Sequence, residues 1–269
     1  MIKVQYAVIS DVGSKRSNNE DIAYADGKLI RDGEGNGEID LRQGIAAFAV
    51  ADGMGGYEGG EVASEIVARS FSSLIRHFEY EDDDNVIMKL KDWAAKANRL
   101  VIETASLRPE LSEMGSTFIG ALVLFNQLFM LNVGDSRCYR WRQGTLKQLS
   151  TDHSERERRG DSSIPSNIIY NFMGIDPSEF ISDISVLSPH EGDTYMLCSD
   201  GLSDLIPFEE LESAFLSSSG CKPPESKGLS DDDYSKTQLA LTEISKKLVA
   251  MAKEEGGRDN ITVLIFTIS

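Results

Sequence analysis

The sequence predicts an α+β fold in layers, with the strands grouped together and the helices grouped together. Two observations support this prediction: short apolar runs typical of strands dominate the chain, and two helical patterns follow each other without a strand between them. In addition, some neighbouring strands are separated by only two residues, which favours hairpins and antiparallel pairing. Together these features favour α+β layering over alternating βαβ units.

The individual elements follow from hydrophobic periodicity. Two helices are predicted where apolar residues recur every three or four positions, from Val62 to Phe78 and from Ile87 to Ala105, and a third near 238–254. Hairpin turns are expected at Asn126–Gln127 and Gln143–Gly144. Strands are expected at about 4–10, 45–51, 117–125, 128–134, 137–142, 182–188, 194–199 and 260–268.

Three polar segments are interpreted as loops within one domain that covers residues 1–269. They are acidic or rich in Gly, Ser and Pro, and they span 31–40, 80–85 and 217–236. The 41% apolar content suffices for a substantial core.

Charge and cysteine content restrict the classes of function. With 27 basic and 44 acidic residues, the net charge of −17 argues against binding to nucleic acid or to an anionic membrane through bulk electrostatics. The three cysteines, Cys138, Cys198 and Cys221, are widely spaced and fit a reducing compartment better than a disulfide framework. The first residues lack a signal-peptide pattern, and no apolar run approaches membrane-spanning length. We therefore expect a cytoplasmic protein.

Acidic residues recur immediately beside the predicted strands, and the stretch FAVADGMGGYEGGEVA shows this most clearly. An apolar run there delivers Asp52 into a glycine-rich loop that contains no Lys or Arg, so a bare phosphate would be repelled. Similar acids flank four other strands, namely Glu20 and Asp21, Asp135, Asp200 and Asp259. A single aspartate at a strand end is more often a turn former or helix cap. If the acids at all five strand ends come together, their carboxylates predict a site for hard cations such as Mg²⁺ or Mn²⁺, because all of the donor atoms are oxygen.

Seven motifs, in order along nearly the whole chain, resemble the metal-dependent Ser/Thr protein phosphatases of the protein phosphatase 2C type. The compact form resembles the bacterial members. The motifs are GSKRSNNED (13–21), VADGMGG (50–56), GSTFIGALV (115–123), NVGDSRCYRW (132–141), LSTDHS (149–154), LCSDGLSD (197–204) and GGRDNITVLIF (256–266). The resemblance implies a sandwich of two antiparallel β-sheets with helices on both outer faces and a metal site at one end.

The resemblance also implies roles for individual residues. Asp52 would bridge two Mn²⁺ or Mg²⁺ ions, with the Gly53 carbonyl as a further ligand. Arg16 would grip the substrate phosphate, and Asn260 would support Asp259. The other implied metal contacts are those of Asp200 and Asp259, of Glu20 and Asp21 through water, and of Asp135, which would share a third ion with Asp200.

The implied reaction is hydrolysis of phosphoserine and phosphothreonine in proteins by hydroxide that bridges the two ions, reversing a Ser/Thr protein kinase. The protein would act as a monomer. Some members of the family carry a histidine two residues after the bridging aspartate to protonate the leaving oxygen, but Met54 stands at that position here. His153 is a substitute by residue type; a structural histidine and a proton supplied by water are the alternatives.

A short flap-like segment near 153–174 is expected beside the site. It mixes Arg156, Arg158 and Arg159 with acids, so it either meets phosphorylated or acidic substrate segments or is a solvated charged loop.

Two other classes compete with an enzyme: an inactive phosphatase-fold binding or regulatory module, and a metal-stabilised structural protein. The intact Asp52, Asp200 and Asp259 argue against the first, and Arg16 beside the acids argues against the second. The aspartates also lack the spacing of an EF-hand calcium loop.

Overall fold

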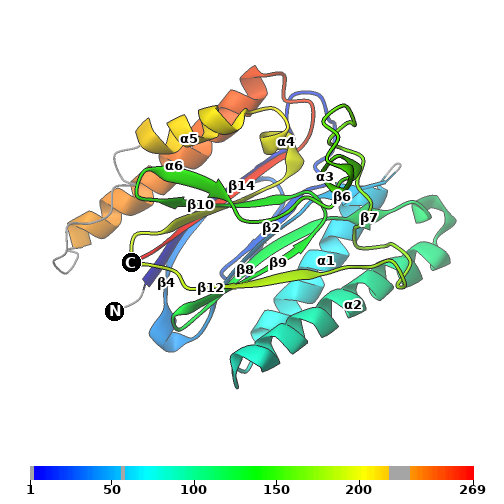
Figure 1. The fold of residues 1–269 in the computed structure, drawn as a ribbon, viewed down its shortest axis with the longest axis horizontal. Helices are drawn as coiled ribbons and strands as arrows, with labels where there is room; N and C mark the ends of the chain where they lie inside the picture. The colour runs from blue at the N-terminus through cyan, green and yellow to red at the C-terminus, as the bar shows by residue number, and fades with distance from the viewer. Residues whose placement is uncertain (1–2, 56–57, 218–230) are drawn as a thin grey trace.

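The computed structural model describes residues 3–55, 58–217 and 231–269, and its centre is a pair of facing six-stranded antiparallel sheets (Figure 1). A two-stranded sheet, β6 (Gly53–Met54) with β7 (Gly115–Ser116), lies at one end. The first large sheet has the strand order β11 (Thr145–Gln148), β10 (Arg137–Arg142), β13 (Thr194–Cys198), β14 (Ile261–Ile268), β1 (Lys3–Asp11), β4 (Gly33–Asp40). The second has the order β12 (Asp183–Leu187), β9 (Gln127–Val133), β8 (Phe118–Leu124), β5 (Ala46–Ala51), β2 (Ile22–Ala25), β3 (Lys28–Ile30).

The space between the two large sheets is filled by apolar side chains from both of them. The Phe48 ring of β5 stacks on the Phe266 ring of β14, with 4.5 Å between centroids. Along β5, Ala46, Phe48 and Val50 point into this interior, whereas the alternate alanines join the cluster on the opposite face. Because both faces of β5 are buried, its sequence is continuously apolar rather than alternating.

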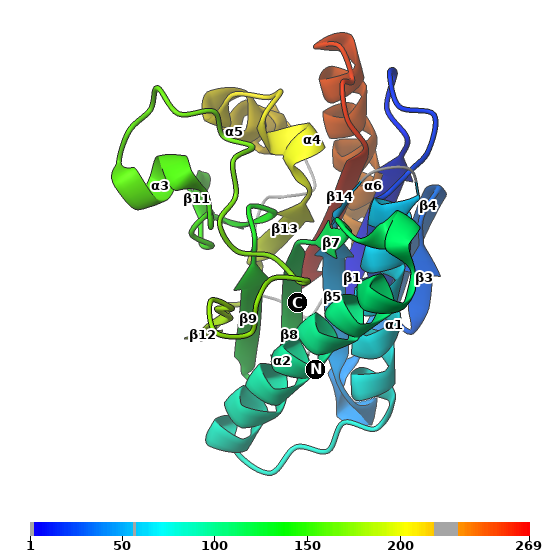
Figure 2. The same cartoon turned by 90° about the vertical axis from the view of Figure 1, so that its right-hand side faces the viewer.

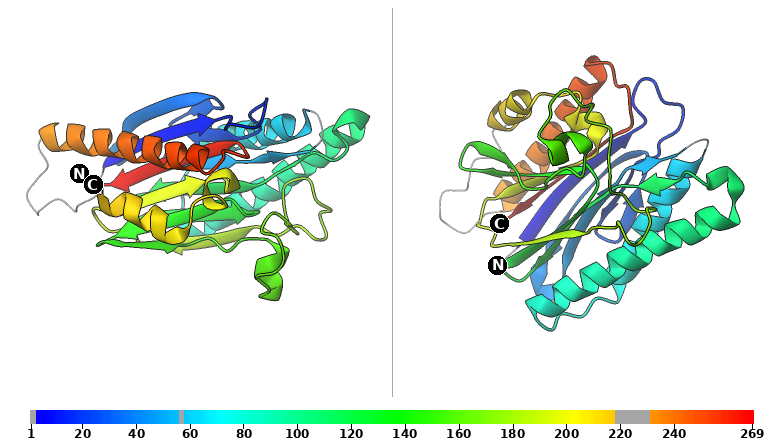
Figure 3. Two further views of the ribbon diagram at one scale, coloured as in Figure 1. Left: turned by 90° about the horizontal axis from the view of Figure 1, so that it is seen from above. Right: turned by 45° about the vertical axis from the view of Figure 1, so that its right-hand side comes forward.

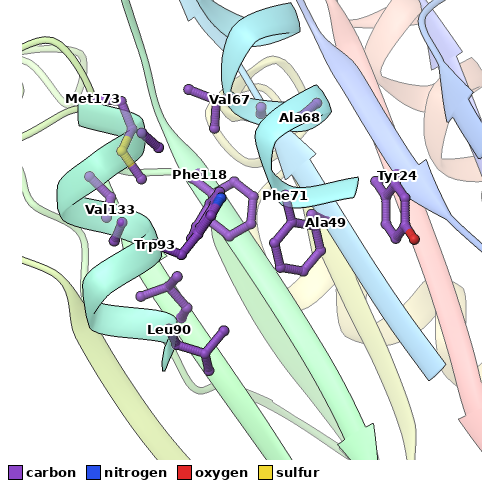
Figure 4. Packing of buried hydrophobic residues seen from close by; sticks show 14 of the residues in the cluster. Tyr24, Ala49, Val67, Ala68, Phe71, Leu90, Trp93, Phe118, Val133 and Met173 are labelled. Atoms are coloured by element: carbon purple, nitrogen blue, oxygen red, sulfur yellow. The ribbon is translucent and has the colours of Figure 1, made fainter. Parts of the chain in front are cut away.

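The outer face of the second sheet is covered by α1 (Gly59–Arg76) and α2 (Asp83–Leu107) (Figure 2). Phe71 of α1, Trp93 of α2 and Phe118 of β8 pack edge-on or tilted, with ring centroids 4.7–5.2 Å apart (Figure 4). Aromatic pairs in these geometries contribute beyond the area that they bury. This cluster therefore fixes both helices against the sheet.

The outer face of the first sheet is covered by α5 (Phe208–Ser217) and α6 (Asp231–Glu254), which completes four layers (Figure 3). Leu241, Ile244 and Leu248 of α6 belong to the same buried cluster as alternate residues of β14. Two short helices, α3 (Glu155–Arg159) and α4 (Asp200–Ser203), and two 3-10 turns, Leu41–Gln43 and Pro109–Leu111, complete the described structure. No helix in the described part of the chain combines the length and apolar character needed to cross a membrane.

The predicted fold class and all eight predicted strands are confirmed, each strand to within one residue at either end. Both predicted hairpins are present, with Leu124 opposite Gln127 and Arg142 opposite Thr145.

The predicted loop at 31–40 is wrong. Its residues form β4, an edge strand that pairs with β1 from Lys3–Asp40 to Ser10–Gly33. Main-chain hydrogen bonds hold this strand, and its side chains contribute little to the core. Its sequence therefore shows no hydrophobic pattern that would predict a strand.

Two other loop boundaries also differ from the prediction. The loop at 80–85 ends early, because α2 begins at Asp83 with the Asp82 carboxylate capping the Asn85 N–H at 2.8 Å. The loop at 217–236 ends where α6 begins at Asp231, and residues 218–230 lie outside the described structure.

Candidate active site

The acids at the five strand ends gather at one end of the sandwich. Figure 1 shows β6, β7 and α4 at this end. There all of these acids except Asp21 line a cleft of about 220 Å³. Antiparallel pairing explains the gathering. In an antiparallel sheet the end of one strand lies beside the beginning of its neighbour, so residues that follow one strand and residues that precede the other lie at the same edge. The cleft is lined by Arg16, Glu20, Asp52, Gly53, Met54, Asp135, Asp200 and Asp259, together with Gly55, Thr117, Asn167 and Ile169.

Asp52 enters the cleft directly after β5, and its main chain is held on both sides. The Thr117 N–H donates to the Asp52 carbonyl at 2.8 Å, and the Asp52 N–H donates to Thr117 Oγ1 at 3.2 Å. Burial, and then the charges of Asp21 and Asp200, raise the pKa of Asp52 well above its usual range. A rigid main chain thus holds a carboxylate where its charge is costly unless a cation accompanies it.

Gly53 is required by the close approach of two other segments to the main chain that follows Asp52. A Cβ at this position would lie 2.0 Å from the Gly60 carbonyl oxygen and 2.8 Å from that of Glu20. Gly201, next to Asp200, has a similar constraint, because a Cβ there would lie 1.9 Å from the Asn260 carbonyl oxygen. The glycines beside the two aspartates therefore permit the tight packing of the cleft walls.

Asp21 lies behind the cleft surface, with only 1% of its surface exposed. Ser199 Oγ donates to Asp21 Oδ2 at 2.6 Å, whereas Oδ1 has no hydrogen-bond partner among the described residues. Burial raises the pKa of Asp21 to about 6. A buried carboxylate oxygen without a partner is expected to bind water or a cation.

Asp200 and Asp135 also line the cleft, and a further acid, Asp204, lies near both of them. Burial raises the pKa of Asp135 to about 7, with contributions from the charges of Asp152 and Asp204. Burial and the charge of Asp135 raise the pKa of Asp200 well above its usual range, and Asp204 adds to this effect. Sequence reasoning missed Asp204. The sequence held one indication of Asp204, because it lies in the motif LCSDGLSD four residues after Asp200, directly after a short helix.

Arg16 reaches the cleft from the loop after β1 and pairs with Asp259. Its Nη2 lies 2.7 Å from Asp259 Oδ2, and about half of the Arg16 side chain is exposed. The side chain of Asn260 does not bind Asp259; it accepts from the Glu20 N–H at 2.8 Å and donates to the Val12 and Asn18 carbonyls. Asn260 therefore supports the site by holding the loop that carries Arg16 and Glu20, while only its main-chain N–H bonds to Asp259.

The donor set of the cleft fits divalent ions, although its ligands are not already gathered around one point. The donors are carboxylates and main-chain carbonyls, which suit Mg²⁺ and Mn²⁺. In the described parts of the chain, no three Asp, Glu, His or Cys side chains are arranged to hold an ion. Two of the acids contact protein groups instead, since Asp259 pairs with Arg16 and Asp21 accepts from Ser199. The raised pKa values and the unpartnered Asp21 oxygen still point to a cationic ligand.

His153 does not line the cleft. It is buried, and its Nδ1 accepts from the Gly134 N–H at 3.1 Å and from Asn171 Nδ2 at 2.6 Å. Its Nε2 lies 3.1 Å from Asp183 Oδ2. Both ring nitrogens are thus engaged inside the protein, which favours the structural alternative. Met54, at the position of the family histidine, does line the cleft and offers no proton.

The two cysteines in the described structure are also not candidates for a nucleophile. Cys138 and Cys198 are fully buried, and burial raises the pKa of both thiols, that of Cys198 to about 12. Cys221 lies outside the described residues.

The flap-like segment 153–174 is attached to the core at both of its ends. At its start the His153 N–H donates to the Gly134 carbonyl at 3.0 Å, and near its end an isolated bridge pairs Met173 with Ser116; a second bridge, Ser154 with Ile169, lies within the segment. At its far end, the Asn98 amide of α2 accepts from the Gly174 N–H at 2.6 Å and donates to the Ile175 carbonyl at 2.9 Å. Asn98 was not singled out from the sequence, because a buried asparagine on an amphipathic helix carries no signal for a distant partner.

The three flap arginines have different surroundings. Arg158 and Arg159 both pair with Glu155, and Arg158 also lies over the Tyr170 ring, 5.0 Å from its centroid. Arg156 instead donates from its Nε to the Ile164 carbonyl, also in the flap, at 2.6 Å, and lines a second cavity.

Comparisons with known proteins agree with the motifs. The family model "Protein phosphatase 2C" matches residues 34–241. "Serine/threonine phosphatase stp" of Listeria welshimeri is 29% identical over 256 residues, covering 89% of this chain and 91% of the relative. "Serine/threonine protein phosphatase PstP" of Mycobacterium tuberculosis is 28% identical over 97% of this chain, which spans only 44% of that relative. Among solved structures, the PstP catalytic domain in complex with two manganese ions is 27% identical, with a TM-score of 0.76 over 100% of this chain and 99% of that one.

Proposed function

The chain belongs to the protein phosphatase 2C family, and we propose that it is a metal-dependent enzyme that hydrolyses phosphoserine and phosphothreonine in proteins. The observation that carries the proposal is the convergence of Asp52, Asp200 and Asp259 with Arg16 in one cleft. Three of these side chains suit cations and the fourth suits a phosphate. The names of the relatives, serine/threonine phosphatases, support the same substrate class.

The carboxylates of Asp52, Asp200 and Asp259, with the Gly53 carbonyl, would hold two Mn²⁺ or Mg²⁺ ions. Glu20 and Asp21 would contribute through water. The two manganese ions of the related PstP structure support this assignment. When bound, such ions lower the pKa of water and stabilise the charge that develops on a phosphoryl group. A third ion near Asp135 and Asp200 is part of the proposal. Asp204 lies close enough to both carboxylates to add negative charge around that ion.

Arg16 would bind the phosphate of the substrate. Its guanidinium has a planar set of donors that matches phosphate oxygens, and the side chain, which lines the cleft, is about half exposed. Asp259 accepts a hydrogen bond from one of these donors in the structure. A cation bound by Asp259 would release that donor for the phosphate, and a phosphate bound by Arg16 would release the carboxylate for the cation, so the two binding events favour each other. The described residues that line the cleft include no histidine, so we assign protonation of the leaving oxygen to water.

An inactive binding module is not favoured, because every residue of the implied site is present and most line one cleft. We further propose a single catalytic domain over residues 1–269, a monomeric state, a cytoplasmic location and a Ser/Thr protein kinase as the enzyme whose products are reversed.

The test is phosphate release from a phosphothreonine peptide by metal-stripped protein, titrated with Mn²⁺ and with Mg²⁺. Asp52→Asn removes the central carboxylate at constant size, and Asp92→Asn, on the exposed face of α2, is the matched control. We expect metal-dependent release by the wild type and the control, with a loss of at least about 100-fold in Asp52→Asn. Equal activity in all three proteins, or none with either ion, would overturn the proposal.

A further inference from the structure

A second cavity, of about 330 Å³, adjoins the catalytic cleft on the flap side. It shares Asn167, Asp200 and Asp259 with the cleft, so the two spaces lie side by side. One wall is the flap loop around Ser166 and the other is the core around Leu205. We call this cavity the flap groove. A peptide with its phosphate in the cleft would place neighbouring residues here, since each extended residue spans about 3.4 Å.

Two exposed arginines line the flap groove from opposite sides. Arg156 comes from α3, and Arg258 comes from the loop before β14. Within the described residues, neither arginine forms an ion pair, and Arg258 also has no hydrogen bond. In a chain with 44 acidic residues, two arginines that face one cavity without a carboxylate partner are available to an external anion.

Each of the three acids that line the groove has a contact or a proposed role outside the arginine pair. Ser166 Oγ donates to Asp204 Oδ2 at 2.6 Å, which ties the flap loop to the core. Asp200 and Asp259 are the carboxylates that the proposed function assigns to the ions. The Arg156 Nε is bound to the Ile164 carbonyl, which orients the side chain and leaves the two terminal nitrogens of its guanidinium open. The arginine side of the groove therefore presents positive charge to a substrate.

We propose that the flap groove binds an anionic side chain of the substrate, within about two residues of the phosphoresidue, through Arg258 and Arg156. The ligand is the carboxylate of a flanking Asp or Glu or a second phosphate, which share the same recognition by guanidinium. This inference rests on the proposed function and assigns its specificity. It also gives the three flap arginines different roles. Arg156 binds the substrate anion, whereas Arg158 and Arg159, which pair with Glu155, do not contact the substrate anion.

The test compares phosphothreonine peptides that differ only at the flanking positions, with Glu, its isostere Gln, Lys or phosphoserine. For each protein we take the ratio of kcat/KM for the Glu peptide to that for the Gln peptide, which cancels changes in folding or metal content. We expect a wild-type ratio of about 10, equivalent to ~1.4 kcal/mol, that falls as salt is added. In Arg258→Gln and Arg156→Gln the ratio should approach about 1, mainly through KM.

Arg159→Gln is the matched control, since it removes the same charge from the same helix outside the groove, and it should keep the wild-type ratio. Arg258→Glu should invert the preference toward the Lys peptide. A phosphoserine peptide that exceeds the Glu peptide would identify a phosphate as the ligand; the reverse order would identify a carboxylate.

A wild-type ratio near 1 on active enzyme would overturn the flap groove and leave the proposed function intact. An equal loss of the ratio in Arg159→Gln would also overturn it, because general electrostatics would then be responsible. Failure of the wild type to release phosphate from any peptide with Mn²⁺ would instead contradict the proposed function.

Discussion

Replacing Asp135 by Asn should stabilise the protein in the absence of divalent ions, even though it harms the proposed site. Asp135 is buried among other carboxylates, and burial with the charges of Asp152 and Asp204 raises its pKa to about 7. A carboxyl whose folded-state pKa is raised holds its proton more tightly when folded. The resulting stability is fully present below the unfolded pKa and is lost as the pH rises through the folded pKa.

The size of the effect follows from the two pKa values. Burial raises the pKa of Asp135 from its ordinary value of 3.8 to about 7. At about 1.4 kcal/mol for each pKa unit, the charged aspartate lowers the free energy of unfolding by up to about 4 kcal/mol at pH 8. An asparagine keeps the size of the side chain and carries no charge, so it escapes this cost. Below about pH 4 the aspartate is protonated in both states, and the two proteins should have similar free energies of unfolding.

The assay is urea unfolding of both proteins in EDTA at a series of pH values between about 4 and 8. We expect the advantage of Asp135→Asn to grow from near zero to between about 2 and 4 kcal/mol, and to shrink in saturating Mn²⁺, which stabilises the wild type by binding. An advantage that is the same at every pH would refute the reasoning, because it would come from packing rather than from charge. A variant less stable than the wild type at pH 8 would refute it as well.

Three further predictions concern two residues that line the cleft and one buried histidine outside it. Gly53→Ala should lower the free energy of unfolding by about 2 kcal/mol or more, measured in urea, because its Cβ would meet the Gly60 carbonyl; a neutral result would contradict the packing. Arg16→Lys should reduce kcat/KM on a phosphopeptide by about 10 to 100-fold, while calorimetry should show Mn²⁺ affinity less affected. His153→Gln should lower the melting temperature, because the Asn171 amide and a main-chain N–H lose their acceptor, and should leave the pH profile of kcat unshifted; a shift would restore His153 as the proton donor.

The sequence predicted the sandwich and the gathering of acids for different reasons. Long buried strands such as β5 and β14 are continuously apolar, so their existence follows from the pattern alone. That Asp52 and Asp259 meet depends on antiparallel pairing, which hairpin spacing indicates only for strands close together in the chain. The resemblance to a family supplied the rest of that topology.

What the sequence did not predict depends on contacts between distant or weakly patterned segments. β4 is rich in glycine and is held by main-chain pairing, so it has no hydrophobic signature. The hydrogen bonds of Asn98 to the flap and of Ser166 to Asp204 join residues far apart in the chain. The flap arginines look alike in sequence, and only the partners of each side chain separate Arg156 from its neighbours.

The presence of two divalent ions in the carboxylate cleft around Asp52 underlies the whole proposed reaction. It is tested most directly by equilibrium dialysis of metal-stripped wild type and Asp52→Asn against Mn²⁺, with bound manganese counted per chain and folding monitored by circular dichroism. We expect two tightly bound ions in the wild type and fewer in the folded variant. Equal numbers of bound ions in the two proteins, or none in the wild type, would contradict it.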